Sequence, residues 1–393
     1  LELNGDPSLE RESGAGPMLY DLAMQLASTG VRKLRGPLVV QTADGPASDV
    51  YPAAWSRHHR GRTFAPLIGP ITLNENLVWV TVAPGSRAGA RVRVLDVLPA
   101  GASRLVSVSA TTRRGRRSRL ALRGRSDGGW VLTGTIGTGA HPRSVGAVVN
   151  QPKVLLDAVW AHALARAGIT WDRAAYTAAP APEATPRALA EVSSPTLDSL
   201  ASEINRRSLN YGAELLLQWA GGRETAPERL TAHVLEITGQ QSGVELVDGS
   251  GLSYDDRVTP NTFIAYLAKF PETPEGRNFP QLLPANGTGT LRRLHSGLPG
   301  EGVVRAKTGT LGQVANVVGY LGRPDGVLLV ALMYNGPRPW AARQEEWTLL
   351  RMLGAHGVVI PSDSVPDDLV PHLGGEESDT SAAPLTPPDS AAR

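Results

Sequence analysis

Residues 303–311 read Val-Val-Arg-Ala-Lys-Thr-Gly-Thr-Leu, and their alternation predicts a β-strand. Successive side chains of a strand point to opposite faces, so Val304, Ala306 and Thr308 would share one face. Arg305 and Lys307 would point to the other face, with Gly309 in register behind them. The stretch therefore predicts a strand whose two faces differ in charge.

Two further strand-like runs follow this stretch. They cover residues 314–321 and 327–334, and the Gly-Arg-Pro-Asp-Gly sequence at 322–326 is a turn signal between them. The pattern predicts an antiparallel meander that carries a Lys-Thr-Gly triplet on its leading strand.

The Lys-Thr-Gly triplet has a chemical use, although three common residues also recur by chance. Lys307 would supply a fixed positive charge for a carboxylate, and Thr308 would supply a hydroxyl donor beside it. Gly309 would remove the side chain that blocks the approach of a substrate to the strand. Whether the triplet marks an active site depends on partner residues elsewhere in the chain.

The composition is that of a globular protein. The chain has 393 residues, of which 41% are hydrophobic and 19% charged, so it is long enough for two or three domains with their own cores. Its 43 Gly and 31 Pro residues predict many turns and a β-rich portion. The formal net charge is only +2, which gives no basis for a nucleic-acid partner.

Several absences narrow the chemistry. The chain has no cysteine, which excludes disulfides, thiolate zinc sites and Cys nucleophiles, and it has no run of 18 apolar residues that would span a membrane. His58 and His59 have no third ligand at a suitable spacing, so we favour surface histidines over a metal site and predict no cofactor. The chain begins at Leu1 without a recognisable signal peptide, and we expect the numbering to begin inside a longer gene product.

A basic cluster lies between residues 113 and 125. Its members are Arg113, Arg114, Arg116, Arg117, Arg119, Arg123 and Arg125. We favour a solvated hairpin, and the alternative is a contact with an anionic polymer, for instance of a cell wall.

Changes in pattern divide the chain. Residues 51–144 contain many short β-like runs punctuated by Gly, Pro or Asn, which predicts an inserted β-rich region. Residues 1–50 and 145–355 are expected to form one α/β (α+β) domain. Residues 361–393 are rich in Pro, Ser, Asp, Glu and Ala and are predicted to be a disordered tail.

A helix that starts near residue 194 carries polar residues where apolar ones are expected. Ser194 is the predicted N-cap, with Pro195 at the first helical position. The apolar stripe continues through Ile204 to Ser208. One interpretation is a break between two helices, with Ser208 or Asn210 capping the second. The other is that both side chains point into a cleft, and the two interpretations are compatible.

Several short motifs follow one another in an order that resembles a known family. In chain order they are Gly5-Asp6-Pro7-Ser8-Leu9, Asn74-Glu75-Asn76, Pro84-Gly85, Ser194-Pro195-Thr196-Leu197, Ser208-Leu209-Asn210, Asp248-Gly249-Ser250-Gly251-Leu252-Ser253, Arg257-Val258-Thr259-Pro260, Leu283-Pro284, Gly289-Thr290-Leu291-Arg292-Arg293 and Arg305-Ala306-Lys307-Thr308-Gly309-Thr310-Leu311. This set closely resembles the D-alanyl-D-alanine carboxypeptidase/endopeptidase family, the class C low-molecular-mass penicillin-binding proteins (peptidase family S13), over about residues 1–355. The resemblance implies a transpeptidase- or β-lactamase-like fold, with a central antiparallel sheet flanked by helices and with inserted β-rich domains.

The resemblance implies a serine acyl-enzyme mechanism, in which a Ser-x-x-Lys serine attacks the D-Ala-D-Ala carbonyl and water hydrolyses the acyl-enzyme. Its implied catalytic residues in this chain are Ser208, Asn210 and Lys307. Ser208 would relay a proton near the leaving nitrogen, and Asn210 would hold the substrate amide.

The same resemblance implies which strand binds the substrate, which partners the protein has and where in the cell it is located. Lys307 and Thr308 would bind the terminal carboxylate, Gly309 would give the strand room, and the backbone N–H of Thr310 would belong to the oxyanion hole. The implied partners are peptidoglycan stem peptides and β-lactams, and the implied location is periplasmic or extracytoplasmic.

The family's nucleophile motif, Ser-x-x-Lys, does not occur in these 393 residues. The lysines are Lys33, Lys153, Lys269 and Lys307, and the residues three before them are Gly30, Asn150, Tyr266 and Val304. In the family the motif lies upstream of the Gly-Asp-Pro segment, with which this chain almost begins. We expect a gene product that continues upstream, and the alternatives are a misassigned start or a degenerate homologue. The chain as it stands would be hydrolytically inactive.

Two functions remain open on the sequence. The first is a DD-peptidase of peptidoglycan, and the second is a non-catalytic homologue that binds peptidoglycan or a partner with the same fold. An esterase or β-lactamase of the same superfamily is less favoured, because those proteins lack the large insertion before the Ser-x-Asn motif.

Overall fold

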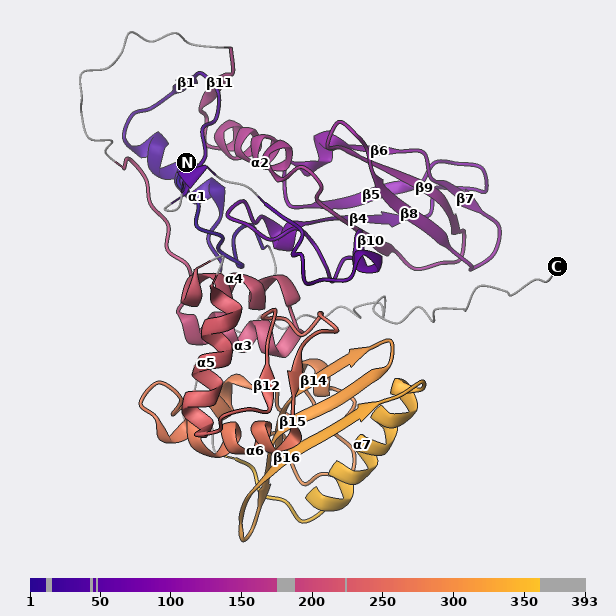
Figure 1. Ribbon diagram of the computed structural model, residues 1–393. Coiled ribbons are helices and arrows are strands. Elements are labelled where there is room, and N and C mark those ends of the chain that lie inside the picture. The colour runs from indigo at the N-terminus through magenta and orange to yellow at the C-terminus, as the bar shows by residue number, and fades with distance from the viewer. Residues whose placement is uncertain (12–15, 43–44, 47–48, 175–187, 223–224, 361–393) are drawn as a thin grey trace, which may run out of the picture.

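The computed structural model describes residues 1–11, 16–42, 45–46, 49–174, 188–222 and 225–360. The predicted disordered tail at 361–393 lies outside the described residues. The described chain mixes helices with several sheets and forms an N-terminal lobe, up to residue 174, and a C-terminal lobe, from residue 188 (Figure 1). Among the described residues, no helix has the length and apolar character that crossing a membrane requires.

The C-terminal lobe is built on the predicted meander, which is confirmed. Strands β14 (Val304–Leu311), β15 (Val314–Arg323) and β16 (Gly326–Asn335) form a three-stranded antiparallel sheet in that order. The register pairs Lys307 with Val318, and strand β14 is at one edge of the sheet.

Helices cover both faces of this sheet. Val304 and Ala306 are buried in a core with Trp347 and Leu350 of helix α7 (Pro339–Gly354). On the other face, Leu267 of helix α6 (Pro260–Lys269) packs in a cluster with Tyr320 and Val318 of β15. The apolar face predicted for residues 304 and 306 is therefore confirmed, and Lys307 projects from the face of the sheet opposite to it.

The N-terminal lobe contains the β-rich region. One sheet has the order β10-β4-β5, and in a second sheet β6 and β7 run parallel to β9 while β8 runs antiparallel to it. The strands are β4 (Leu77–Ala83), β5 (Arg93–Leu98), β6 (Val106–Val108), β7 (Thr111–Arg113), β8 (Arg119–Gly124), β9 (Trp130–Gly137) and β10 (Arg143–Val148).

Segments from both ends of the N-terminal lobe pack against these sheets. Helices α1 (Leu19–Ser28) and α2 (Pro152–Arg166) share one core with Val80 of β4 and Trp130 of β9. The N-terminal lobe also contains four short strands, which are β1 (Lys33–Arg35), β2 (Gln41–Thr42), β3 (Gly45–Pro46) and β11 (Thr170–Asp172). The predicted domain bounds at 50 and 144 stay a prediction.

Three helices and two short strands come before the sheet in the C-terminal lobe. They are α3 (Leu197–Arg207), α4 (Asn210–Gly221), α5 (Ala226–Thr238), β12 (Val244–Glu245) and β13 (Arg257–Val258). Single turns of 3-10 helix complete the fold at Arg57–His59, Asn74–Asn76, Ala102–Leu105, Phe270–Glu272, Phe279–Leu282 and Gly289–Leu291.

The predicted N-cap of the linking helix α3 is wrong. Thr196, not Ser194, caps the helix, because its hydroxyl oxygen accepts a hydrogen bond from the N–H of Ser199 at 3.4 Å. Ser194 precedes a proline, which favours an extended backbone, and its hydroxyl donates to the carboxylate of Asp6 at 2.8 Å.

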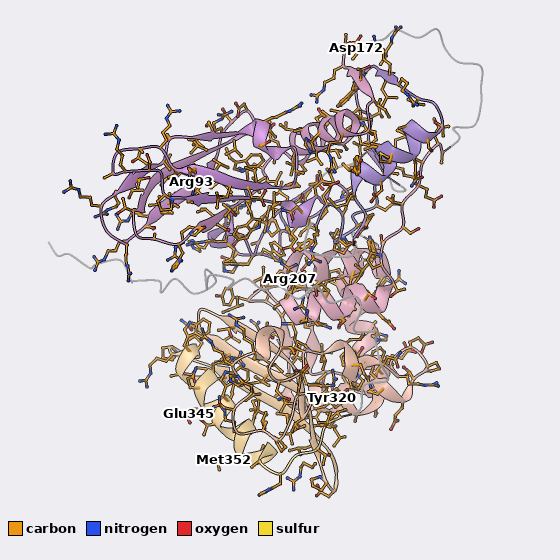
Figure 2. The ribbon with its side chains drawn as sticks, turned by 180° about the vertical axis from the view of Figure 1, so that it is seen from behind. Arg93, Asp172, Arg207, Tyr320, Glu345 and Met352 are labelled. Carbon is orange, nitrogen blue, oxygen red and sulfur yellow. The ribbon has the colours of Figure 1, made fainter. Side chains whose placement is uncertain are left out.

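A buried ionic cluster joins the lobes at helix α3. Arg11 contacts Glu75 at 3.1 Å and Glu203 at 2.8 Å, and Arg207 also pairs with Glu75. Arg207 lies where the two lobes meet (Figure 2). The carboxylates thus neutralise guanidinium groups that come from both lobes.

Helix α4 is bound to the start of the chain as well. The hydroxyl of Tyr211 donates to the carbonyl of Pro7 at 2.6 Å, and the indole N–H of Trp219 donates to the carbonyl of Asn4 at 2.8 Å. Both helices that flank residue 208 are therefore held by residues of the N-terminal lobe.

Candidate active site

Ser208 lies at a break between helices α3 and α4. Its backbone is left-handed, with φ 58° and ψ 55°, a conformation that non-glycine residues seldom adopt. The N–H of Leu209 donates to the carbonyl of Ile204 at 3.0 Å, which closes the end of α3. The predicted break is confirmed, but Ser208 ends the first helix instead of capping the second, and Asn210 is the first residue of α4.

The break brings Ser208 against Lys307 of strand β14. The ammonium group of Lys307 donates to Oγ of Ser208 at 2.8 Å and to the carbonyl of Thr308 at 2.7 Å. Burial, followed by the positive charge of Arg343, lowers the pKa of Lys307 to about 8. The amine is therefore cationic below that pH and becomes neutral above it, which suits a group that binds anions and can also exchange a proton.

Arg343 of helix α7 holds strand β14 from the face that α7 covers. It is 4% exposed, and its guanidinium donates to the carbonyl of Gly309 at 2.7 Å and to the hydroxyl of Thr310 at 2.9 Å. It also pairs with Glu346 at 2.6 Å. Arg343 was not predicted, because it lies in helix α7 and no local pattern in the sequence connects it with the triplet.

Among the described residues, no strand pairs with the outer edge of β14 beyond residue 306. Ala306 donates to the carbonyl of Pro284 at 3.0 Å on this edge. Because alternate residues of an antiparallel strand direct their backbone groups to the same side, Thr308 and Thr310 direct theirs to this edge as well. A Cβ added to Gly309 would meet nothing within 4 Å. The edge can therefore receive an extended peptide backbone.

Asn210 lies two residues beyond Ser208, but its amide serves a different contact. Its Nδ2 donates to the carbonyl of Phe64, in the N-terminal lobe, at 2.8 Å. The structure thus brings Ser208 and Lys307 into direct contact and places Asn210 at the junction with the segment that carries Phe64.

Aromatic side chains lie beside the end of β14. The ring of His59 is 5.3 Å from that of Phe64 and 6.4 Å from that of Tyr254, measured between centroids. Leu311, the last residue of β14, packs against a buried cluster that includes Trp55. Burial, and then the positive charges of neighbouring residues, lowers the pKa of His59. His59 therefore belongs to an aromatic group, and no set of three metal-binding side chains was found among the described residues.

A buried pair of acids supports the loop that follows β12. One carboxylate oxygen of Glu214 accepts hydrogen bonds from the N–H groups of Gly249 and Ser250, each at 3.0 Å. Asp248 accepts from Ser250 at 3.0 Å and from Gly251 at 2.6 Å. Burial and the nearby charge of Asp248 raise the pKa of Glu214 to about 7.

This pKa predicts a pH-dependent effect of Glu214→Gln. Between the ordinary pKa of Glu and about 7 the native state binds more protons than the unfolded state, so the stability of the wild type falls as the pH rises through this window. Glutamine keeps the acceptor oxygen without the charge. The variant should therefore be more stable than the wild type by about 1–3 kcal/mol above pH 7, with the gain shrinking at acidic pH. Urea unfolding across this range measures it.

The matched control is Glu228→Gln, which removes the same charge from an exposed position of α5. It should leave the pH profile unchanged. A Glu214→Gln effect of the same size at every pH would contradict the assignment of the raised pKa to this carboxyl group.

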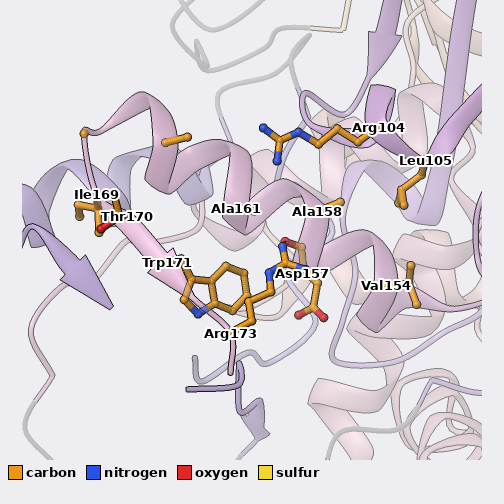
Figure 3. A pocket seen from close by; sticks show the side chains of 12 residues that line it. Arg104, Leu105, Val154, Asp157, Ala158, Ala161, Ile169, Thr170, Trp171 and Arg173 are labelled. Carbon is orange, nitrogen blue, oxygen red and sulfur yellow. The ribbon is translucent and has the colours of Figure 1, made fainter. Parts of the chain in front are cut away.

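A cavity in the N-terminal lobe is separate from this site. Its volume is about 830 Å³, and it is lined by α2 and by the segment around β11 (Figure 3). Arg173 lies over the Trp171 ring, 4.3 Å from its centroid, and donates to the backbone carbonyl of Asp157 at 3.0 Å. None of the predicted site residues lines this cavity, so it is not part of the candidate active site.

Comparisons with known proteins agree with the resemblance. The family model described as the D-Ala-D-Ala carboxypeptidase 3 (S13) family matches residues 1–353. The chain is 27% identical to the D-alanyl-D-alanine carboxypeptidase of Actinomadura sp. (strain R39), over 86% of this chain and 66% of that protein. It is 36% identical over 188 residues to a carboxypeptidase of Mycobacterium tuberculosis, which covers 43% of this chain and 40% of that protein. The chain thus spans about two thirds of the length of the first relative and less than half of the second.

The solved structures show the same fold. Penicillin binding protein 4 of Haemophilus influenzae matches with a TM-score of 0.68 and 20% identity, over 90% of this chain and 81% of that one. A structure of that protein complexed with a β-lactam matches with a TM-score of 0.63 and 19% identity, over 90% and 80% of the two chains. The predicted fold class is confirmed. Since the family model covers 353 of the 393 residues, the chain belongs to the D-Ala-D-Ala carboxypeptidase 3 (S13) family.

Proposed function

We propose that the protein is a serine-type D-Ala-D-Ala carboxypeptidase or endopeptidase that acts outside the cytoplasm on peptidoglycan stem peptides. The observation that carries the proposal is the 2.8 Å contact between Lys307 and Ser208 beside an open strand edge. A cation, a hydroxyl group and the outward-directed backbone groups of Thr308 and Thr310 then face one place where the end of a peptide can lie.

The edge of β14 supports the binding step. An extended stem peptide would form main-chain hydrogen bonds with Thr308 and Thr310, as in other cases of strand addition. Its terminal carboxylate would lie near Lys307 and the hydroxyl of Thr308, while Gly309 leaves room for the peptide. The N–H of Thr310 would stabilise the oxyanion that forms on the scissile carbonyl.

The contact with Lys307 supports the chemical step. A serine nucleophile would attack the carbonyl and form an ester while the bond to the leaving D-Ala nitrogen breaks. These 393 residues contain no Ser-x-x-Lys motif that would supply this serine. Ser208 would pass a proton to that nitrogen, and Lys307 would orient its hydroxyl. Asn210, which now holds the carbonyl of Phe64, would hold the substrate amide. Water would then hydrolyse the ester.

β-Lactams are proposed to acylate the same serine. The solved structure of Haemophilus influenzae penicillin binding protein 4 with a β-lactam, on the same fold, supports this part of the proposal. The carboxylate of such a compound would occupy the place of the terminal carboxylate of the peptide.

Labelling with a fluorescent penicillin tests the proposal. The chain of residues 1–393 is compared with a version extended by the upstream coding sequence, and both are first shown to be folded by circular dichroism. We expect only the extended version to be labelled, because only that version would carry the nucleophile.

The second candidate is a non-catalytic homologue of the same fold that binds peptidoglycan or a partner. Failure of both folded versions to label would support it. Labelling of the 393-residue chain alone would instead show that one of its own serines is the nucleophile, and would contradict the assignment made here.

A further inference from the structure

Three turns meet at the free end of the N-terminal lobe, the end opposite α2 (Figure 1). They cover residues 84–93, 113–119 and 137–143. Backbone hydrogen bonds tie them together: Gly89 donates to Thr112 at 2.8 Å, Thr138 donates to Arg113 at 2.8 Å, and Gly139 donates to Gly115 at 3.0 Å. The three turns therefore form one continuous surface.

This surface, which we call the arginine tip, is strongly cationic. It carries nine exposed arginines and no Asp or Glu. The arginines are Arg87, Arg91, Arg93, Arg113, Arg114, Arg116, Arg117, Arg119 and Arg143. Figure 2 labels Arg93 and shows nitrogen-tipped side chains around this end of the lobe. The net charge of the whole chain is only +2, so the positive charge is concentrated here.

The tip is more than the solvated hairpin that the sequence favoured. Arg125, at the other end of β8, is paired with Asp127 at 2.7 Å, whereas no ion pair was found for the arginines of the tip among the described residues. The strand order brings in arginines from turns that lie up to about 50 residues away in the sequence. Like charges held together in this way repel one another and attract anions.

The backbone of the tip is closely packed. A Cβ added to Gly137 would lie 2.3 Å from the carbonyl oxygen of Gly115, so two of the turns touch through their backbones. An ordered backbone reduces the conformational entropy that the tip loses when it binds a ligand.

The chemistry of the tip selects among polyanions. Its three turns contain no Phe, Tyr or Trp, whereas single-stranded nucleic acids are held by stacking on such side chains and membrane interfaces by Trp and Tyr. Arginine binds phosphate groups with two parallel hydrogen bonds. None of the nine arginines lines the cavity beside α2, and all nine are exposed, which favours an extended polymer over a small ligand.

We propose that the arginine tip binds an anionic polymer of phosphodiester-linked polyols in the cell wall. The contact would hold the protein at the wall through a surface that is separate from the Lys307 site. The choice of a wall polymer rests on the proposed function, whereas the charge and shape of the tip do not.

The test measures binding of the folded protein to poly(glycerol phosphate) by fluorescence anisotropy at several salt concentrations. The tip variant carries Arg113→Gln, Arg114→Gln, Arg116→Gln and Arg117→Gln. The control variant removes the same charge from scattered exposed positions, through Lys33→Gln, Arg35→Gln, Arg229→Gln and Arg277→Gln.

We expect the tip variant to bind at least about tenfold more weakly at low salt. The slope of the logarithm of the binding constant against the logarithm of the salt concentration should become shallower by about 0.7 for each lost contact. The control variant should stay within about twofold of the wild type. Circular dichroism confirms that both variants are folded.

Three outcomes would overturn the proposal. They are the absence of binding by the wild type, equal losses in both variants, and tighter binding of oligothymidylate or of phosphatidylglycerol vesicles than of poly(glycerol phosphate). The vesicles are included because Val94 and Leu95 are exposed beside Arg93. Penicillin labelling is measured separately, so a failure here is distinguishable from a failure of the proposed function.

Discussion

Replacing Glu75 by alanine is expected to lower the free energy of unfolding by about 3–5 kcal/mol, which is a large part of the stability of a typical domain. Glu75 is 9% exposed and pairs with both Arg11 and Arg207. Its removal leaves two guanidinium groups with Glu203 as their remaining carboxylate. Burying a charge without its partner costs far more than losing an exposed ion pair. Denaturant unfolding, with the slope checked for a change, measures the loss.

The matched control for Glu75 is Asp325→Ala. Asp325 pairs with Arg323 at 3.1 Å, but its side chain is 75% exposed, so the expected loss is below about 1 kcal/mol. Glu75→Gln, which keeps the shape without the charge, should lie between the two. Losses of equal size for Glu75→Ala and Asp325→Ala would mean that the ionic cluster does not hold the lobes together.

Lys307→Ala, made in the extended version of the chain, is expected to slow acylation by a carboxylate-bearing β-lactam by about 30- to 1000-fold, equivalent to about 2–4 kcal/mol. The alanine removes the cation that would bind the carboxylate and the donor that orients Ser208. Stopped-flow measurement of the second-order acylation constant gives the effect, and Lys153→Ala, at an exposed position, is the control.

The pH profile separates the charge of Lys307 from its packing. Because its pKa is lowered to about 8, the wild type holds the cation below pH 8 and loses it above. Acylation by the wild type should therefore fall as the pH rises through 8, whereas the residual rate of Lys307→Ala should show no such step. Acylation that is unchanged by the substitution would remove Lys307 from the site.

The parts of the fold that follow local periodicity could be predicted from the sequence. The alternation at 303–311 and the turn after residue 321 are local signals, and both appear in the sheet as expected. The N-cap at Ser194 was wrong for a local reason too, because a proline follows it and Thr196 stands directly before the first helical residue.

Contacts between distant segments could not be predicted in this way. Arg11 and Glu203 are 192 positions apart, and no period or spacing connects them. The contact of Arg343 with Thr310 depends on how helix α7 lies on the sheet. The contact between Ser208 and Lys307 joins residues 99 positions apart, and the sequence placed them in one site only through the resemblance of the ordered motifs. The structure shows this contact, but the roles given to the site residues all stay predictions: Ser208, Asn210, Lys307, Thr308, Gly309 and Thr310.

The bonds between the lobes also decide which pieces of this protein can be studied alone. Although Ser208 and Lys307 both belong to the C-terminal lobe, the helices around Ser208 are held by Pro7, Glu75 and the carbonyl of Phe64. A C-terminal fragment made by itself would keep every residue of the Lys-Thr-Gly strand, yet it would expose the charges of Arg207 and Glu203 and lose the anchors of α4. Its ligand affinity should return when the N-terminal fragment is added in trans, so the two halves of the chain are suited to a complementation assay.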